Sequence, residues 1–153
     1  MPDNSSRELP EGSSGYDLAK DIGPGLAKSA VAVSVDGVQR DLHDVIEGDA
    51  SVSIITIDSD EGIEIMRHTL TAQVLARAIK NLYPKSKLAI GPTIDDGFYY
   101  DVESEKSISS DDLSKIEDEM KKIIKTKSSI TKKLVSKSEA LKVFKEKKES
   151  YKE

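Results

Sequence analysis

The sequence has no cysteine, no tryptophan and only two histidines, His43 and His68, which are far apart in the chain. The lack of cysteine excludes disulfide bonds, thiol nucleophiles and cysteine-based metal clusters, and two distant histidines do not indicate a zinc site. No apolar run approaches the roughly 18 residues of a membrane-spanning helix. Residues 1–15 also lack the basic start and the apolar core of a secretory signal. These absences predict a cytoplasmic chain with no membrane partner.

Positive charge is concentrated in the last third of the 153-residue chain, where arginine is missing. Residues 1–103 carry 9 basic and 18 acidic side chains, whereas residues 104–153 carry 14 lysines and 10 acidic side chains. Counterion release would favour an RNA backbone beside such lysines, but arginine clamps and aromatic stacking platforms are scarce there. We therefore interpret these lysines as solvated helix faces. The length and the 37% apolar content allow one domain or two small ones.

The first sixty residues have the pattern of a small mixed unit. Apolar spacing predicts a short helix over residues 16–22, which Gly23-Pro24-Gly25 should end because proline cannot continue a helix. β-branched runs predict strands over residues 30–36, 38–42 and 51–57, with Asp36-Gly37 as a hairpin turn. Residues 7–10 read as the remnant of a first strand. This order of elements predicts a ubiquitin-like β-grasp fold.

The remaining residues predict a second α+β part. Apolar residues at helical spacing indicate an amphipathic helix over residues 61–83, with Asp60 as its N-cap and Pro84 as its end. Strands over residues 87–94 and 97–102 should form a hairpin, followed by a helix that begins at Ser109 or Ser110. A strand over residues 130–135 and a capping box from Ser136 into a last helix complete the order α-β-β-α-β-α. We expect helices packed on one side of a mainly antiparallel sheet.

Residues 9–58, which begin LPEGSSGYDLAKDIGPGLAK and end SVSIITID, resemble the TGS domain that begins threonyl-tRNA synthetases. Their first strand is shorter than the family's opening hairpin. Residues 1–8 are separately expected to be a disordered N-terminus. Residues 67–101, RHTLTAQVLARAIKNLYPKSKLAIGPTIDDGFYYD, resemble the start of the bacterial family's editing domain. The resemblance implies that residues 61–153 are the truncated N-terminal part of an editing domain. The whole chain would then be an N-terminal fragment of such a synthetase.

The histidine pair of this family is incomplete in the sequence. In the family, two histidines four residues apart act with a downstream cysteine and further histidines to hydrolyse serine wrongly attached to the tRNA for threonine. Gln73 occupies the second position, and the first is either Thr69 or, with one inserted residue, His68. In an α-helix, residues four apart lie about 40° from each other and residues five apart about 140°. His68 and Gln73 are therefore the candidate catalytic positions, but we expect them on different helix faces. Glutamine also cannot shuttle a proton.

The sequence lacks the residues that carry out aminoacylation in this family. The three motifs of class II synthetases are absent, so the family's ATP, magnesium and zinc belong to a core outside these 153 residues. We expect no cofactor in the chain, and neither aminoacylation nor editing by the chain alone. The resemblance implies tRNA for threonine and the remainder of a synthetase as partners, with no membrane and no DNA. The alternative is a non-catalytic TGS module that binds RNA, a small ligand or a protein. Free-standing editing is a third, weaker possibility, because the histidine pair is broken.

Overall fold

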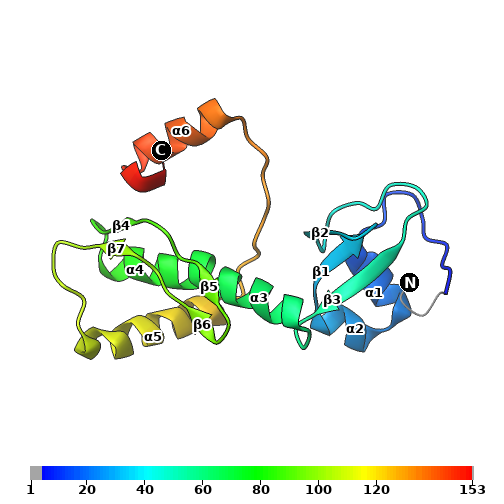
Figure 1. Ribbon diagram of the computed structural model, residues 1–153, viewed down its shortest axis with the longest axis horizontal. Helices are drawn as coiled ribbons and strands as arrows, with labels where there is room; N and C mark the ends of the chain where they lie inside the picture. The colour runs from blue at the N-terminus through cyan, green and yellow to red at the C-terminus, as the bar shows by residue number, and fades with distance from the viewer. Residues whose placement is uncertain (1–4, 153) are drawn as a thin grey trace. The chain divides into compact units, whose positions relative to one another are not determined.

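The computed structural model describes residues 5–152, which form two units. The first unit ends at Met66 and the second begins at Arg67. Figure 1 shows the helices and strands of both. The boundary falls inside one helical stretch, because α3 (Asp60–Thr69) continues into the π-helix η1 (Leu70–Leu75) and then into α4 (Ala76–Leu82). Each unit has its own cluster of buried apolar residues.

The first unit is built on a three-stranded antiparallel sheet. Its elements are α1 (Gly15–Ile22), α2 (Pro24–Ser29), β1 (Ala30–Val35), β2 (Val38–Asp41) and β3 (Val52–Thr56), and the strand order is β2-β1-β3. The predicted helix and these three strands are confirmed. The core of the unit lies between α1 and the sheet, and its buried residues are Leu18, Val33, Val35 and Val52.

Local chemistry explains the two sharpest reversals in this unit. Asp36 and Gly37 both have positive φ (51° and 78°), as a tight hairpin turn of primed type requires. The hydroxyl of Ser14 accepts from the backbone N–H of Asp17, whose carboxylate in turn accepts from the backbone N–H of Ser14 at 2.9 Å. This capping box starts α1 and, through the Ser14 hydrogen bonds, lowers the pKa of Asp17.

One expectation for the first unit is wrong, and another is confirmed but incomplete. Residues 7–10 form no strand, and Arg7 instead pairs with Asp21 at 2.7 Å. Gly23-Pro24-Gly25 does end the predicted helix, because α1 stops at Ile22 with Gly23 as its C-cap, but Pro24 then opens a second helix, α2, which the sequence did not predict. Proline is well suited to the first turn of a helix, where its missing N–H has no helical partner. Of residues 1–8, which were expected to be disordered, residues 1–4 lie outside the described range.

The second unit combines helices with an interrupted hairpin. After α4 come β4 (Lys87–Leu88), β5 (Thr93–Ile94), β6 (Gly97–Phe98) and β7 (Val102–Glu103), followed by α5 (Ser110–Lys125), α6 (Lys137–Glu146) and the 3₁₀-helix η2 (Ser150–Lys152). β4 pairs with β7 and β5 pairs with β6, both antiparallel. The predicted hairpin is confirmed, although its middle is irregular. Its core, shared with α4 and α5, contains Ala76, Ala78, Ile79, Leu88 and Ile116.

The two helix starts predicted after the hairpin are confirmed. Ser109 with Asp112 and Ser136 with Glu139 each form a capping box. A hydrogen bond from Lys115 and further ones from Ser109 lower the pKa of Asp112 to about 2. The strand predicted over residues 130–135 is wrong: this segment is exposed, has no strand partner, and leaves the Leu134 side chain 88% exposed. A run of strand-forming residues does not become a strand without a partner edge. In place of the single sheet that was expected, the second unit has two separate two-stranded sheets, β4-β7 and β5-β6.

Candidate functional site

His68 and Gln73, the candidate catalytic residues, both lie on the exposed surface of the long helical stretch. His68 is in the last turn of α3, and Gln73 is in the π-helix η1. Thr69, the other candidate for the family's first histidine position, is half-buried one residue after His68. Two of the three positions are thus accessible to a ligand, but only one carries an imidazole.

The π-helix changes the geometry that the sequence predicted. At its end, the backbone N–H of Ala76 donates to the carbonyl of Thr71, five residues earlier. Because the turn is wider than in an α-helix, residues five apart approach the same side. The expectation that His68 and Gln73 lie on different faces assumed a regular α-helix over residues 61–83, which is wrong at η1. A single inserted residue in a helix is accommodated in this way.

Thr71 anchors this wide turn to the hairpin. Its side chain is fully buried, and its hydroxyl donates to the carbonyl of Arg67 at 2.8 Å. A Cβ added to Gly91 would lie 2.9 Å from Thr71 Cγ2 and even closer to the ring of Tyr100. Only glycine permits this approach of Tyr100 to the backbone. Sequence reasoning missed Thr71, since a threonine on a helix gives no sign of complete burial.

A second link between helix and hairpin is polar. The guanidinium of Arg67 donates to the carbonyl of Ile94, in β5, at 3.4 Å. The residues that resemble the family's motif, from Arg67 to the GFYYD segment, therefore lie together in the second unit. The predictions of turn and core roles for that segment agree with the half-buried Phe98 and Tyr100, whereas Tyr99 is 53% exposed.

An open pocket of about 680 Å³ lies beside the same hairpin. Aromatic and aliphatic side chains make up most of its wall, with Glu103 and Lys106 as the charged groups. The apolar wall residues are Leu75, Ile79, Phe98, Tyr99, Tyr100, Val102, Ile108, Leu113 and Ile116. This pocket can accept an apolar or planar group. Sequence reasoning did not identify it, because α5 and the hairpin that form it are far apart in the chain.

Neither a metal centre nor a membrane span is found within residues 5–152. No group of three or more histidine or acidic side chains there is arranged to hold a metal ion. None of the helices in that range combines the length and the apolar character needed to cross a bilayer.

Exposed rings form a small surface in the first unit. The rings of Tyr16 and His43 lie with centroids 5.3 Å apart at an interplanar angle of 40°. Both side chains are exposed, and the backbone N–H of His43 donates to the Asp41 carboxylate at 2.9 Å. Such a pair offers planar surface to a nucleobase or to a protein side chain. No local pattern joins these two residues, which are 27 positions apart.

The sequence of the first unit identifies its domain family. Residues 1–56 match the TGS domain family. The first unit is therefore a TGS domain with a ubiquitin-like β-grasp fold, followed by further α+β structure. TGS domains occur in threonyl-tRNA synthetases and also in other proteins, and they often bind nucleic acids or partner proteins.

The wide turn predicts a result for a histidine added at position 73. The substitution Gln73→His should bring a second imidazole near His68. Because nickel favours imidazole ligands, the affinity for Ni²⁺ should rise about tenfold, which is 1.4 kcal/mol of binding free energy. The control is Ala72→His, which restores the four-residue spacing of an α-helix. Isothermal titration calorimetry measures both affinities. A larger gain for Ala72→His would show that the regular α-helical spacing holds in solution.

Proposed function

We propose that this chain is the TGS and leading editing-like region of a threonyl-tRNA synthetase, and that it binds tRNA without catalysing a reaction on it. The observation that carries the proposal is the order of two features. The TGS match over residues 1–56 is followed directly by the RHTLTAQ helix and the GFYYD hairpin. A TGS domain alone occurs in several kinds of protein, whereas this continuation resembles the synthetase family in particular.

The packing of the second unit supports the proposal. The two ends of the motif meet through the hydrogen bond from Arg67 to the carbonyl of Ile94. They meet again where Tyr100 covers Gly91 beside the buried Thr71. Tyr99 and His68 are both exposed in this unit. Rigid placement of aromatic side chains favours stacking on unpaired bases, which is how proteins commonly recognise single-stranded RNA ends.

The side chains at the motif support binding rather than catalysis. A general acid or base must titrate near neutral pH, and glutamine at position 73 does not. His68 provides one imidazole, without the second histidine or the cysteine that the family uses. A lone exposed imidazole can hydrogen-bond or stack, but it does not form an activated pair. We therefore assign His68 and Gln73 to the ligand-facing surface and not to a reaction.

One observation favours an alternative in which only the TGS domain binds. The exposed Tyr16–His43 pair lies in the first unit and needs no help from the second. In that case the chain is a TGS module for RNA or a protein partner, and its second unit has a separate role.

Cross-linking separates these two functions. Under ultraviolet light, the chain mixed with tRNA for threonine should form cross-links at exposed aromatic residues, located by mass spectrometry. The proposed function predicts cross-links in both units, at Tyr16 or His43 and at Tyr99 or His68. A matched RNA duplex of equal charge serves as the control and should give few of them. Cross-links confined to the first unit would favour the TGS module, and their absence at both would overturn RNA binding.

A further inference from the structure

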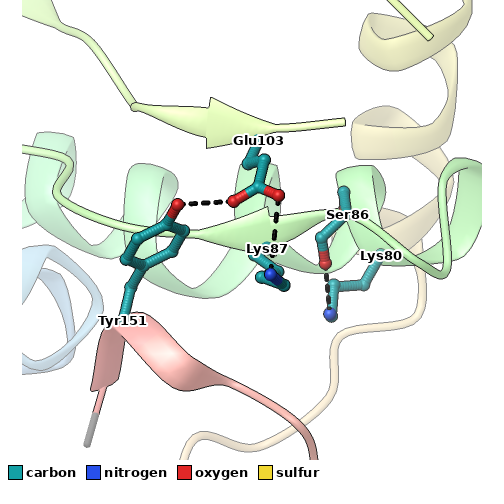
Figure 2. Close-up of polar contacts among 5 residues, drawn as sticks. All are labelled: Lys80, Ser86, Lys87, Glu103 and Tyr151. Atoms are coloured by element: carbon teal, nitrogen blue, oxygen red, sulfur yellow. Dashed lines mark hydrogen bonds and ion pairs between the residues drawn. The ribbon is translucent and has the colours of Figure 1, made fainter. Parts of the chain in front are cut away.

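Residues 149–152 lie against the β4–β7 pair through polar contacts. The Tyr151 hydroxyl donates to the Glu103 carboxylate at 2.5 Å, and Figure 2 shows this contact beside Lys87, Ser86 and Lys80. The ammonium group of Lys152 donates to the carbonyl of Ala89, the residue after β4, at 2.9 Å. The hydrogen bond from Tyr151 and the nearby Lys87 charge lower the pKa of Glu103. We call residues 149–152 the strap.

The strongest contact of the strap is a partly buried ion pair. The Lys80 ammonium lies 2.5 Å from one oxygen of Glu149 and also donates to the carbonyl of Ser86 at 2.7 Å. The Glu149 side chain is only 11% exposed, and its other oxygen, Oε2, is buried without a hydrogen-bond partner. A buried charge with an unpaired oxygen carries a desolvation cost that its partner offsets only in part. The attraction between Lys80 and Glu149 therefore favours the docked strap, whereas the desolvation of the Glu149 carboxylate disfavours it.

The chain that leads to the strap allows it to leave. Residues 128–136 form no helix or strand, and every one of them is exposed. α6, which follows, contacts η2 within the same segment. The core of the second unit is made by α4, α5 and the hairpin, without α6 or the strap. Undocking the strap therefore breaks polar contacts but removes no residue from that buried cluster.

We propose that the strap is a releasable cover for the β4 side of the hairpin, latched by the Lys80–Glu149 pair and opened when that pair is broken. β4 pairs only with β7 among residues 5–152, and η2 is the element beside it. Release frees the carbonyl of Ala89, which the docked strap binds through Lys152. This inference does not depend on the proposed binding of tRNA, because it concerns contacts within the second unit alone.

The absence of cysteine permits a direct test in the full chain. Ser150→Cys provides a unique site for a nitroxide label, whose broadening of the Leu88 and Val102 amide signals reports docking. We expect strong broadening at about 0.05 M salt and only a modest loss of it at about 0.5 M, because salt screens a partly buried pair much less than an exposed one. Lys80→Met should abolish the broadening even at low salt, because it leaves Glu149 buried and unpaired. Lys85→Met is the matched control, since Lys85 pairs with the exposed Glu105 away from the strap, and it should change nothing.

A double substitution keeps the test decisive if Lys80→Met disturbs the fold. Lys80→Met with Glu149→Leu replaces the ion pair by an apolar pair of similar size. We expect the double variant to restore the broadening of the Leu88 and Val102 signals. Tyr151→Phe, at a largely exposed side chain, should lower the equilibrium constant for docking roughly fivefold, because it removes the hydrogen bond to Glu103. Unchanged broadening in Lys80→Met, or a double variant in which the strap stays undocked, would overturn the proposal that the Lys80–Glu149 pair latches the strap.

Discussion

Gly62→Ala is expected to destabilise the first unit by about 3 kcal/mol, although alanine is the better helix former. Gly62 is a buried residue of α3, and a Cβ built on it would lie 1.9 Å from the backbone oxygen of Thr56 and 3.1 Å from the Ser59 hydroxyl. A clash with the backbone cannot be relieved by a side-chain rotation. The start of α3 must therefore move away from the end of β3.

Gly25→Ala is the matched control, and it should act in the opposite direction. Gly25 also lies in a helix, α2, but a Cβ there would meet nothing within 4 Å. Alanine should then stabilise the unit by about 0.5–1 kcal/mol, because it restricts the unfolded chain more than glycine does. Hydrogen exchange of the β1 and β3 amides measures the free energy of unfolding of this unit separately. Equal effects of the two substitutions would contradict the close approach at Gly62.

The chain should not accelerate the hydrolysis of seryl-tRNA for threonine. General acid–base groups typically contribute about 10²–10⁴-fold to such a rate, and this chain offers one exposed imidazole, His68, beside Gln73. We therefore expect the ester to decay at its uncatalysed rate with the chain at saturating concentration. Release of labelled serine over time, compared with a tube that contains no protein, measures this rate.

The same assay distinguishes a missing residue from a missing cluster. Gln73→His places a second imidazole on the wide turn, but the sequence still has no cysteine and no further histidine near it. We expect no acceleration with this variant, even where it gains nickel affinity. Hydrolysis above the background rate in the Gln73→His variant would show that two imidazoles are enough for the reaction, and that the chain is a damaged enzyme rather than a binding surface.

Local signals predicted most of the secondary structure. Asp36-Gly37 specifies its turn through backbone conformation alone, and Ser109 and Ser136 specify helix starts through hydrogen bonds within four residues. The errors arose where the outcome depends on distant partners. Residues 130–135 have strand-forming composition, but strand formation needs a free edge in the right place. The same limit applies to residues 7–10, which pair with no strand.

The helical stretch that carries the candidate residues was predictable, but its local geometry was not. The sequence placed His68 and Gln73 on one regular helix, whereas the structure places His68 in α3 and Gln73 in the π-helix η1 of one helical stretch. The π-helix between them is not visible in apolar spacing, since one extra residue changes the facing of side chains without breaking the amphipathic pattern. The complete burial of Thr71 and the contact of Tyr100 with Gly91 depend on the hairpin folding back onto the helix. The pairing of Lys80 with Glu149 joins residues 69 positions apart, which no local rule detects.

Binding of tRNA is the central claim, and a competition titration tests it most directly. A fluorescent tRNA for threonine is bound to the chain at fixed salt, and unlabelled tRNAs are added while anisotropy is followed. Salt must be fixed because phosphate contacts make RNA affinity strongly dependent on it. Our account predicts that unlabelled tRNA for threonine displaces the label at a concentration about tenfold lower than tRNA for another amino acid, a difference of 1.4 kcal/mol. Equal displacement by both tRNAs, or no binding of the labelled tRNA, would contradict it.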